Sequence, residues 1–65
     1  MGGTGNAPVS WDQLSKGQAI YFYTADGWKK GTIISVNPQS CSILWSIGST
    51  EKTTTVFDLR NVRLT

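Results

Sequence analysis

The sequence predicts a small all-β barrel built from short strands. Apolar, β-branched and aromatic residues gather in runs, and turn residues separate the runs at the roughly eight- to twelve-residue spacing typical of small barrels. No segment between the runs has the length of a regular helix. The runs are Ala19–Thr24, Trp28–Val36, Cys41–Ile47 and Thr53–Leu59, with turns at 26–27, 37–40 and 48–49.

A chain of 65 residues forms a single domain. A domain of this size buries only about 60% of the surface of its unfolded chain, so its stability is expected to be marginal. Charged residues make up only 15% of the chain, and a lightly charged exterior suits an interface. We therefore expect a binding protein, and we leave open a homo-oligomer, because self-association would enlarge a small core.

The N-terminal segment divides into an arm and the start of the barrel. Residues 1–9 contain three glycines and no charged side chain, a composition that predicts a disordered arm. Ser10, with Gln13 three positions later, predicts a helical turn over 10–14. This turn would pack Trp11 and Leu14 over one end of a barrel domain that comprises residues 10–65.

Strand alternation assigns the faces of the first predicted strand. Ile20 and Phe22 belong to the core, because this choice leaves the hydroxyls of Tyr21 and Tyr23 able to reach water. Gly27 supplies the positive φ that a tight hairpin turn at 26–27 requires.

The second predicted strand is long and contains one glycine. Within Trp28–Val36, Gly31 indicates either a β-bulge or a point where strands approach closely. Long, bent second strands allow short strands to close a barrel.

In the second half of the chain, strands and turns are predicted from the same kinds of residue pattern, although the patterns are less regular. Residues 42–45 are too uniformly apolar for alternation to assign their faces. Residues 49–52 are predicted to connect to a threonine-rich strand at 53–57. Asp58 is predicted to cap a helical turn over 58–61, followed by a closing fifth strand at 62–64. The core is completed by Val56, Leu59, Val62 and Leu64.

Cysteine and histidine usage excludes several chemistries. The chain has one cysteine and no histidine, which excludes an internal disulfide, a cysteine-based zinc site and histidine-dependent acid–base catalysis. Cys41 lies in an apolar strand, so we expect a buried, unreactive thiol. We expect no catalytic residue, no metal site and no cofactor.

Hydropathy gives an expectation about location. No apolar run approaches the roughly 18 residues of a membrane span, and the N-terminus lacks the order of a signal peptide. We therefore expect an intracellular, cytoplasmic protein without a membrane partner.

Short motifs over residues 17–64 resemble a known fold family. Gly17 precedes the first strand, Trp28 follows Asp26-Gly27, and Asp58-Leu59 separates the last two strands. This order resembles the SH3-like barrels of the Tudor and Agenet type, which implies a five-stranded SH3-like barrel. Tudor domains bind methylated lysine or arginine in an aromatic cage through cation–π attraction.

Carried over residue by residue, the cage is incomplete. Trp45 matches one cage aromatic, and Tyr23 lies near another. Lys29 stands where an aromatic wall is expected and would repel a methylammonium, and residues 46–49 contain no aromatic side chain. We therefore expect a different use for the aromatic residues, which is a non-catalytic binding or adaptor module that recognises a protein partner through Tyr21, Tyr23, Trp28, Trp45 and Phe57.

Nucleic-acid binding is the alternative. Residues 15–37 also resemble the KOW motif, in which a glycine-punctuated hairpin presents basic residues. Such a protein would contact phosphates with its cations and stack bases on its aromatics. The net charge of +2 is small for this role. The candidate contacts are Lys29, Lys30, Lys52, Arg60 and Arg63.

An enzyme is the least favoured interpretation of the sequence. Type B dihydrofolate reductases are SH3-like barrels of similar layout, with a tryptophan at the start of the second strand. Their pore strand carries Val-Gln-Ile-Tyr, whereas residues 54–58 here are Thr-Thr-Val-Phe-Asp. The glutamine and the tyrosine hydroxyl are missing, and no other constellation offers a nucleophile with a base.

Overall fold

The fold is one antiparallel sheet of five strands. The computed structural model describes Pro8 and residues 10–64. The elements are η1 (Trp11–Gln13), β1 (Ala19–Thr24), β2 (Gly27–Asn37), β3 (Ser40–Ile47), β4 (Thr50–Val56), η2 (Leu59–Asn61) and β5 (Val62–Leu64), where η marks a 3₁₀ turn.

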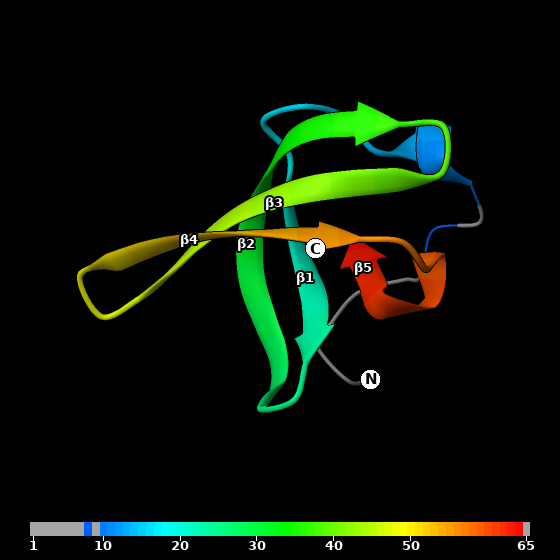
Figure 1. Ribbon diagram of the computed structural model, residues 1–65. Coiled ribbons are helices and arrows are strands. Elements are labelled where there is room, and N and C mark those ends of the chain that lie inside the picture. The colour runs from blue at the N-terminus through cyan, green and yellow to red at the C-terminus, as the bar shows by residue number, and fades with distance from the viewer. Residues whose placement is uncertain (1–7, 9, 65) are drawn as a thin grey trace.

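The strand order is β4-β3-β2-β1-β5, so β4 and β5 form the two edges of the sheet. The sheet is strongly curved, and the β3–β4 hairpin crosses the β1–β2 hairpin and projects beyond it (Figure 1). The predicted all-β fold with five antiparallel strands is confirmed. The hydrogen-bonded ladder, however, does not close into a complete barrel.

Turn geometry corrects the predicted start of the fourth strand. Ile47 pairs directly with Thr50, and only Gly48, at φ +59°, and Ser49 connect the two strands. Residues 50–52, predicted to be part of a connection, therefore belong to β4, and Phe57, predicted to belong to the strand, lies beyond its end. A glycine in the left-handed region makes a two-residue turn, so pairing resumes at once.

The first hairpin is as tight as predicted but is shifted by one residue. Ala25 and Asp26 form the turn, and Gly27, at φ +104°, already pairs with Thr24. The Thr24 hydroxyl donates to the Gly27 carbonyl at 2.8 Å and accepts from the Asp26 N–H at 3.1 Å. This side chain therefore holds both ends of the turn.

Gly31 marks a close approach rather than a bulge. It is buried opposite Ile20, and a methyl group on its Cα would collide with the Ile43 side chain and lie 3.3 Å from the Phe22 ring. Only glycine leaves room for these two core residues.

The bulge in β2 lies at Ile34. Ile33 pairs with Ile43, whereas Ser35 pairs with Ser42, so Ile34 is an extra residue. An extra residue resets the alternation of side chains. Val36 consequently lies on the core face, where it packs against the buried residues.

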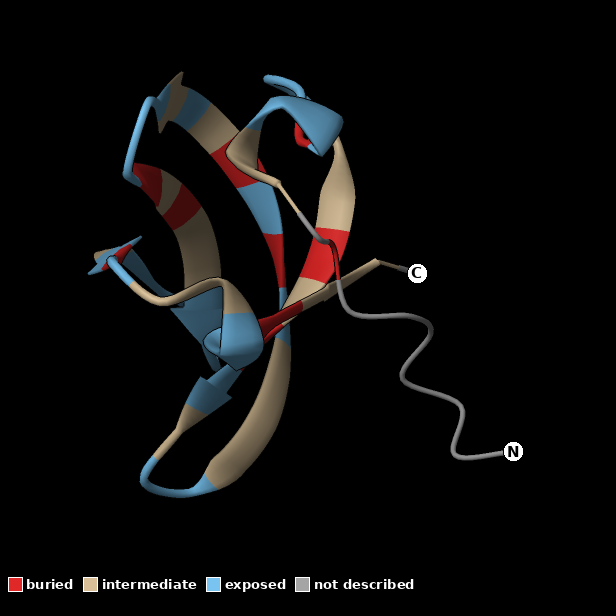
Figure 2. Ribbon diagram, turned by 90° about the vertical axis from the view of Figure 1, so that its right-hand side faces the viewer, coloured by how far each residue is buried: buried red, intermediate tan, exposed pale blue. Residues whose placement is uncertain are grey.

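The core lies on the concave face of the sheet. Ile20 and Phe22 are fully buried as predicted, and so is Cys41. Leu59 and Leu64, predicted as core, are half-buried against it. Figure 2 shows the buried residues spread over several strands. The buried hydrophobic residues are Leu14, Ile20, Phe22, Ile33, Cys41, Ile43, Val56 and Val62.

Both predicted helical turns form, as 3₁₀ turns with the predicted caps. The Ser10 side chain accepts from the Asp12 N–H at 3.4 Å, and the Asp58 side chain accepts from the Arg60 N–H at 2.9 Å. Leu14, just after η1, is buried, and Trp11 packs against the core. The predicted arm lies outside the described residues except for Pro8, which is buried.

Candidate binding surface

Strands β1, β2 and β5 carry aromatic and basic side chains on the convex face of the sheet, which is the face opposite the core. In register, Tyr21 pairs with Arg63 of β5 on one side and with Lys30 of β2 on the other. Tyr23 pairs with Trp28 one step further along the same face. Since Phe22 and Ile20 point into the core, alternation directs these five residues outward. We call this surface the aromatic platform: Tyr21, Tyr23, Trp28, Lys30 and Arg63.

Two of its rings contact each other edge to face. The centroids of Tyr23 and Trp28 lie 5.4 Å apart at an interplanar angle of 66°. Tyr23 is 53% exposed and Trp28 is half-buried. The T-shaped contact restrains both side chains in the free protein. Less side-chain conformational entropy is therefore lost when a partner binds to these two rings.

Arg63 covers the Trp28 ring. Its guanidinium carbon lies 5.0 Å from the ring centroid, within the range of a cation–π interaction. Its Nε is buried and has no hydrogen-bond partner among the described residues. Among the described residues, Arg60 and Asp58 form a salt bridge, whereas neither Arg63 nor Lys30 is paired with a carboxylate.

Trp45 lies on the opposite face of the sheet from the platform. Its ring meets Phe22 edge to face at 5.2 Å and 70°, and its Nε1–H donates to the Thr54 hydroxyl at 2.9 Å. Tyr23 and Trp45, the two residues that match the cage of Tudor domains, are therefore not on the same face.

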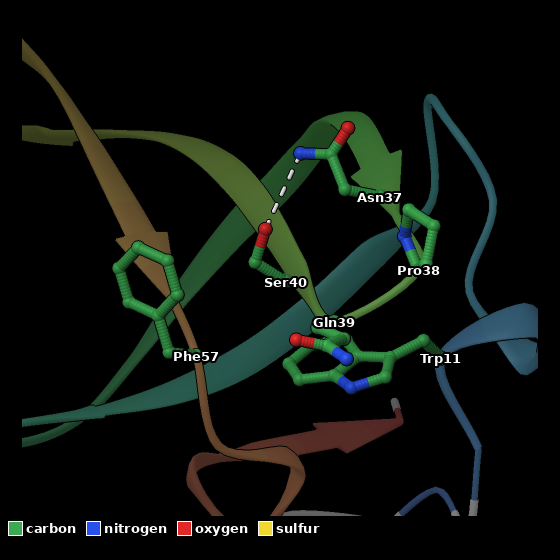
Figure 3. Close-up of a pocket in the computed structure, with 6 residues that line it drawn as sticks. All are labelled: Trp11, Asn37, Pro38, Gln39, Ser40 and Phe57. Carbon is green, nitrogen blue, oxygen red and sulfur yellow. Dashed lines mark hydrogen bonds between the residues drawn. The ribbon is translucent and has the colours of Figure 1, made fainter.

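Phe57 lies apart from both tryptophans of the sheet. It is 74% exposed just beyond β4 and lines an open hollow of about 730 Å³ together with Trp11 and the β2–β3 turn (Figure 3). In that turn, Asn37 Nδ2 donates to Ser40 Oγ at 3.3 Å. The five aromatic residues predicted as one surface thus divide into three places.

The predicted nucleic-acid residues are also dispersed. Lys29 pairs with Phe22 and Lys52 pairs with Trp45, so both start from the concave face. Arg60 donates to Asp58 at 2.8 Å, and this hydrogen bond lowers the pKa of the Asp58 carboxyl. Lys30 and Arg63 alone among the five lie on the platform.

From the sequence, Arg63 was predicted only as a candidate contact for nucleic acid, together with the lysines and Arg60, and its position beside Trp28 was not predicted. The available signal was alternation in 62–64, because two apolar residues flank Arg63 and direct it outward. That pattern does not reveal which strand lies next to β5, so the contact with Trp28 depended on the fold.

Other chemistries find little support in the described residues. Burial raises the pKa of the Cys41 thiol, which disfavours the reactive thiolate. No group of three or more His, Cys, Asp or Glu side chains suited to a metal ion occurs there. Within that part of the chain, no helix has the length and hydrophobicity required to cross a membrane.

Comparisons with protein families, curated proteins and solved structures yield no match for this chain.

Proposed function

We propose that this chain is a non-catalytic binding module that recognises a protein partner through the aromatic platform. The observation that carries the proposal is the pair of the exposed Tyr23 and the half-buried Trp28, held edge to face and flanked by an arginine. Tyrosine, tryptophan and arginine are the residues most enriched among those that dominate binding energy. The resemblance to small SH3-like barrels supports the same general role.

Preorganisation favours the platform over the other exposed aromatic residue. Each ring of the Tyr23–Trp28 pair is restrained by the other, so little side-chain entropy is lost when a partner binds. Phe57 is more exposed, but it has no comparable ring contact among the described residues. We therefore assign recognition to Tyr21, Tyr23 and Trp28.

Nucleic-acid binding is the less supported role. Binding to a duplex or a single strand relies on several phosphate contacts made together. Here three of the five candidate cations lie away from the platform, and one of these, Arg60, is paired with Asp58.

Selection from a displayed library of random peptides tests the proposal, because it does not require an identified partner. We expect the full chain to enrich recurrent sequences whose binding is lost with Tyr23→Ala. The matched control is Phe57→Ala, which removes an exposed aromatic ring away from the platform. Absence of enrichment, or peptides that bind Tyr23→Ala as well as the unaltered chain, would contradict the proposal.

A further inference from the structure

Given the proposed function, we propose further that the partner segment is acidic and that Arg63 receives one of its carboxylates. Lys30, on the other side of Tyr21, receives a second negative charge. The ligand class is thus an extended peptide with two acidic residues, and a methylated or otherwise cationic side chain is excluded.

The position that a ligand cation would take is already occupied. The Arg63 guanidinium lies 5.0 Å from the centroid of Trp28, which is where an ammonium would gain cation–π energy. A second cation there would meet a like charge at short range. The exposed Tyr23 contacts the same Trp28 with its ring, so a ligand that docks on this pair also meets Arg63.

The charge of the platform is unbalanced. None of the three strands that build it, residues 19–24, 27–37 and 62–64, contains an aspartate or a glutamate. Asp26, in the β1–β2 turn, forms no salt bridge with Arg63 within the described residues. Arg63 Nε lacks a hydrogen-bond acceptor there too, but it is buried, so an incoming carboxylate would bind the terminal N–H groups of the guanidinium. No described oxygen therefore competes with an incoming carboxylate, for which the planar guanidinium is the best-matched side chain.

The two cations lie close enough to share one short ligand. Arg63 and Lys30 flank Tyr21 in register, so their Cα atoms are about 10 Å apart at normal strand spacing. The Arg63 guanidinium reaches over Trp28, which is two residues from Lys30 on the same face of β2. Two acidic side chains of one extended peptide can therefore reach both positive groups.

An acidic side chain in a depression next to Lys30 limits how far the acidic ligand can extend across the sheet. Lys30 and Glu51 line the same depression of about 350 Å³ between the two hairpins. Glu51 would repel an acidic segment that continued across β3 and β4. We therefore expect the ligand to lie over β5, β1 and β2.

A peptide fits this charge distribution better than a nucleic acid. Two cations balance two carboxylates, whereas a protein that binds DNA typically contacts about six to ten phosphates. The remaining candidate cations start from the other face or from η2.

The peptides selected on the chain provide the test. We expect aspartate or glutamate to be enriched at two positions relative to the unselected library. A selected peptide should bind about tenfold more weakly to Arg63→Gln, or when its acids are replaced by their amides, because a charge-assisted hydrogen bond is lost. The Nε–H resonance of Arg63 should shift in NMR spectra when the acidic peptide is added.

Lys52→Gln is the matched control, because it removes the same charge from the opposite face and should leave affinity unchanged. Recurrent peptides that are neutral, basic or unaffected by Arg63→Gln would overturn the acidic ligand while leaving the binding module in place. Failure to enrich any peptide would overturn both. A single-stranded oligonucleotide that binds at the same salt and is lost with Arg63→Gln would assign the platform to nucleic acid and overturn the proposal.

Discussion

At the scale of single residues, the two tryptophans of the sheet have different roles although the sequence treats them alike. Trp28 lies on the convex face between Tyr23 and Arg63. Trp45 lies on the concave face, where its ring meets Phe22 and its indole N–H meets Thr54. Substitutions at Trp28 should therefore act on binding, and substitutions at Trp45 should act on stability.

The Trp45–Thr54 hydrogen bond is testable by a double-mutant cycle. Trp45→Phe removes the donor and Thr54→Val removes the acceptor. A side-chain hydrogen bond contributes about 1 kcal/mol to stability, so the two single changes should couple by about that amount in urea unfolding. Strictly additive effects would show that the bond contributes nothing in solution.

The ion pair of Asp58 is a further effect at this scale. Hydrogen bonds from Arg60 lower the pKa of this solvent-accessible carboxyl. A lowered pKa means that folding favours the ionised carboxylate. The Asp58–Arg60 ion pair therefore adds to the free energy of unfolding at pH values above the pKa of a free carboxyl. This added stability is lost as the pH falls through the lowered pKa of Asp58. Solvent screening keeps the contribution of such an exposed pair small.

At the scale of the elements, one residue sets the shape of β2. The bulge at Ile34 allows Ile33 and Val36 both to pack on the core, which uninterrupted alternation would prevent. Bulges also increase local bending, and β2 is the strand that joins the two crossing hairpins (Figure 1). The bulge therefore contributes to the curvature that separates the platform from the concave face.

Deleting Ile34 should remove the bulge but keep the register, because Ile33, Ser35 and Val36 would then alternate without the extra residue and Val36 would stay on the core face. The expected loss is therefore that of the local bend, which should destabilise the fold more than Ile34→Ser, the control that keeps the extra residue. Chemical unfolding measures both changes. A deletion as mild as Ile34→Ser would show that the bulge does not shape the sheet.

At the scale of the whole molecule, the open ladder leaves two edges. β5 is only three residues long, whereas β4 has seven residues and presents mostly threonine with one adjacent pair of opposite charges, Glu51 and Lys52. An edge strand of this length can pair with another chain, and charged side chains limit such pairing. If the chain self-associates, as the sequence leaves open, the β4 edge is where we expect it to pair.

Replacing both charges of β4 by threonine should increase self-association. The resulting strand would combine high β propensity with no charge or proline, which favours edge-to-edge pairing. Light scattering of the Glu51→Thr/Lys52→Thr variant against the unaltered chain measures the change. An unaltered mass across a range of concentrations would show that other features protect this edge.

By itself, the sequence determined the all-β class, five strands, both capped turns and the burial of Ile20 and Phe22, because these depend on local alternation and turn chemistry. It did not determine the start of β4 or the position of the bulge, since both depend on pairing between strands.

The tertiary structure alone decided which aromatic and basic residues share a surface. Tyr23 and Trp28 meet through the register of a hairpin, and Arg63 joins them because β5 returns beside β1. Trp45 and Phe57 are directed elsewhere by the crossing of the second hairpin and by the end of β4. Contacts between residues about 35 positions apart depend on chain topology, which local sequence patterns do not encode.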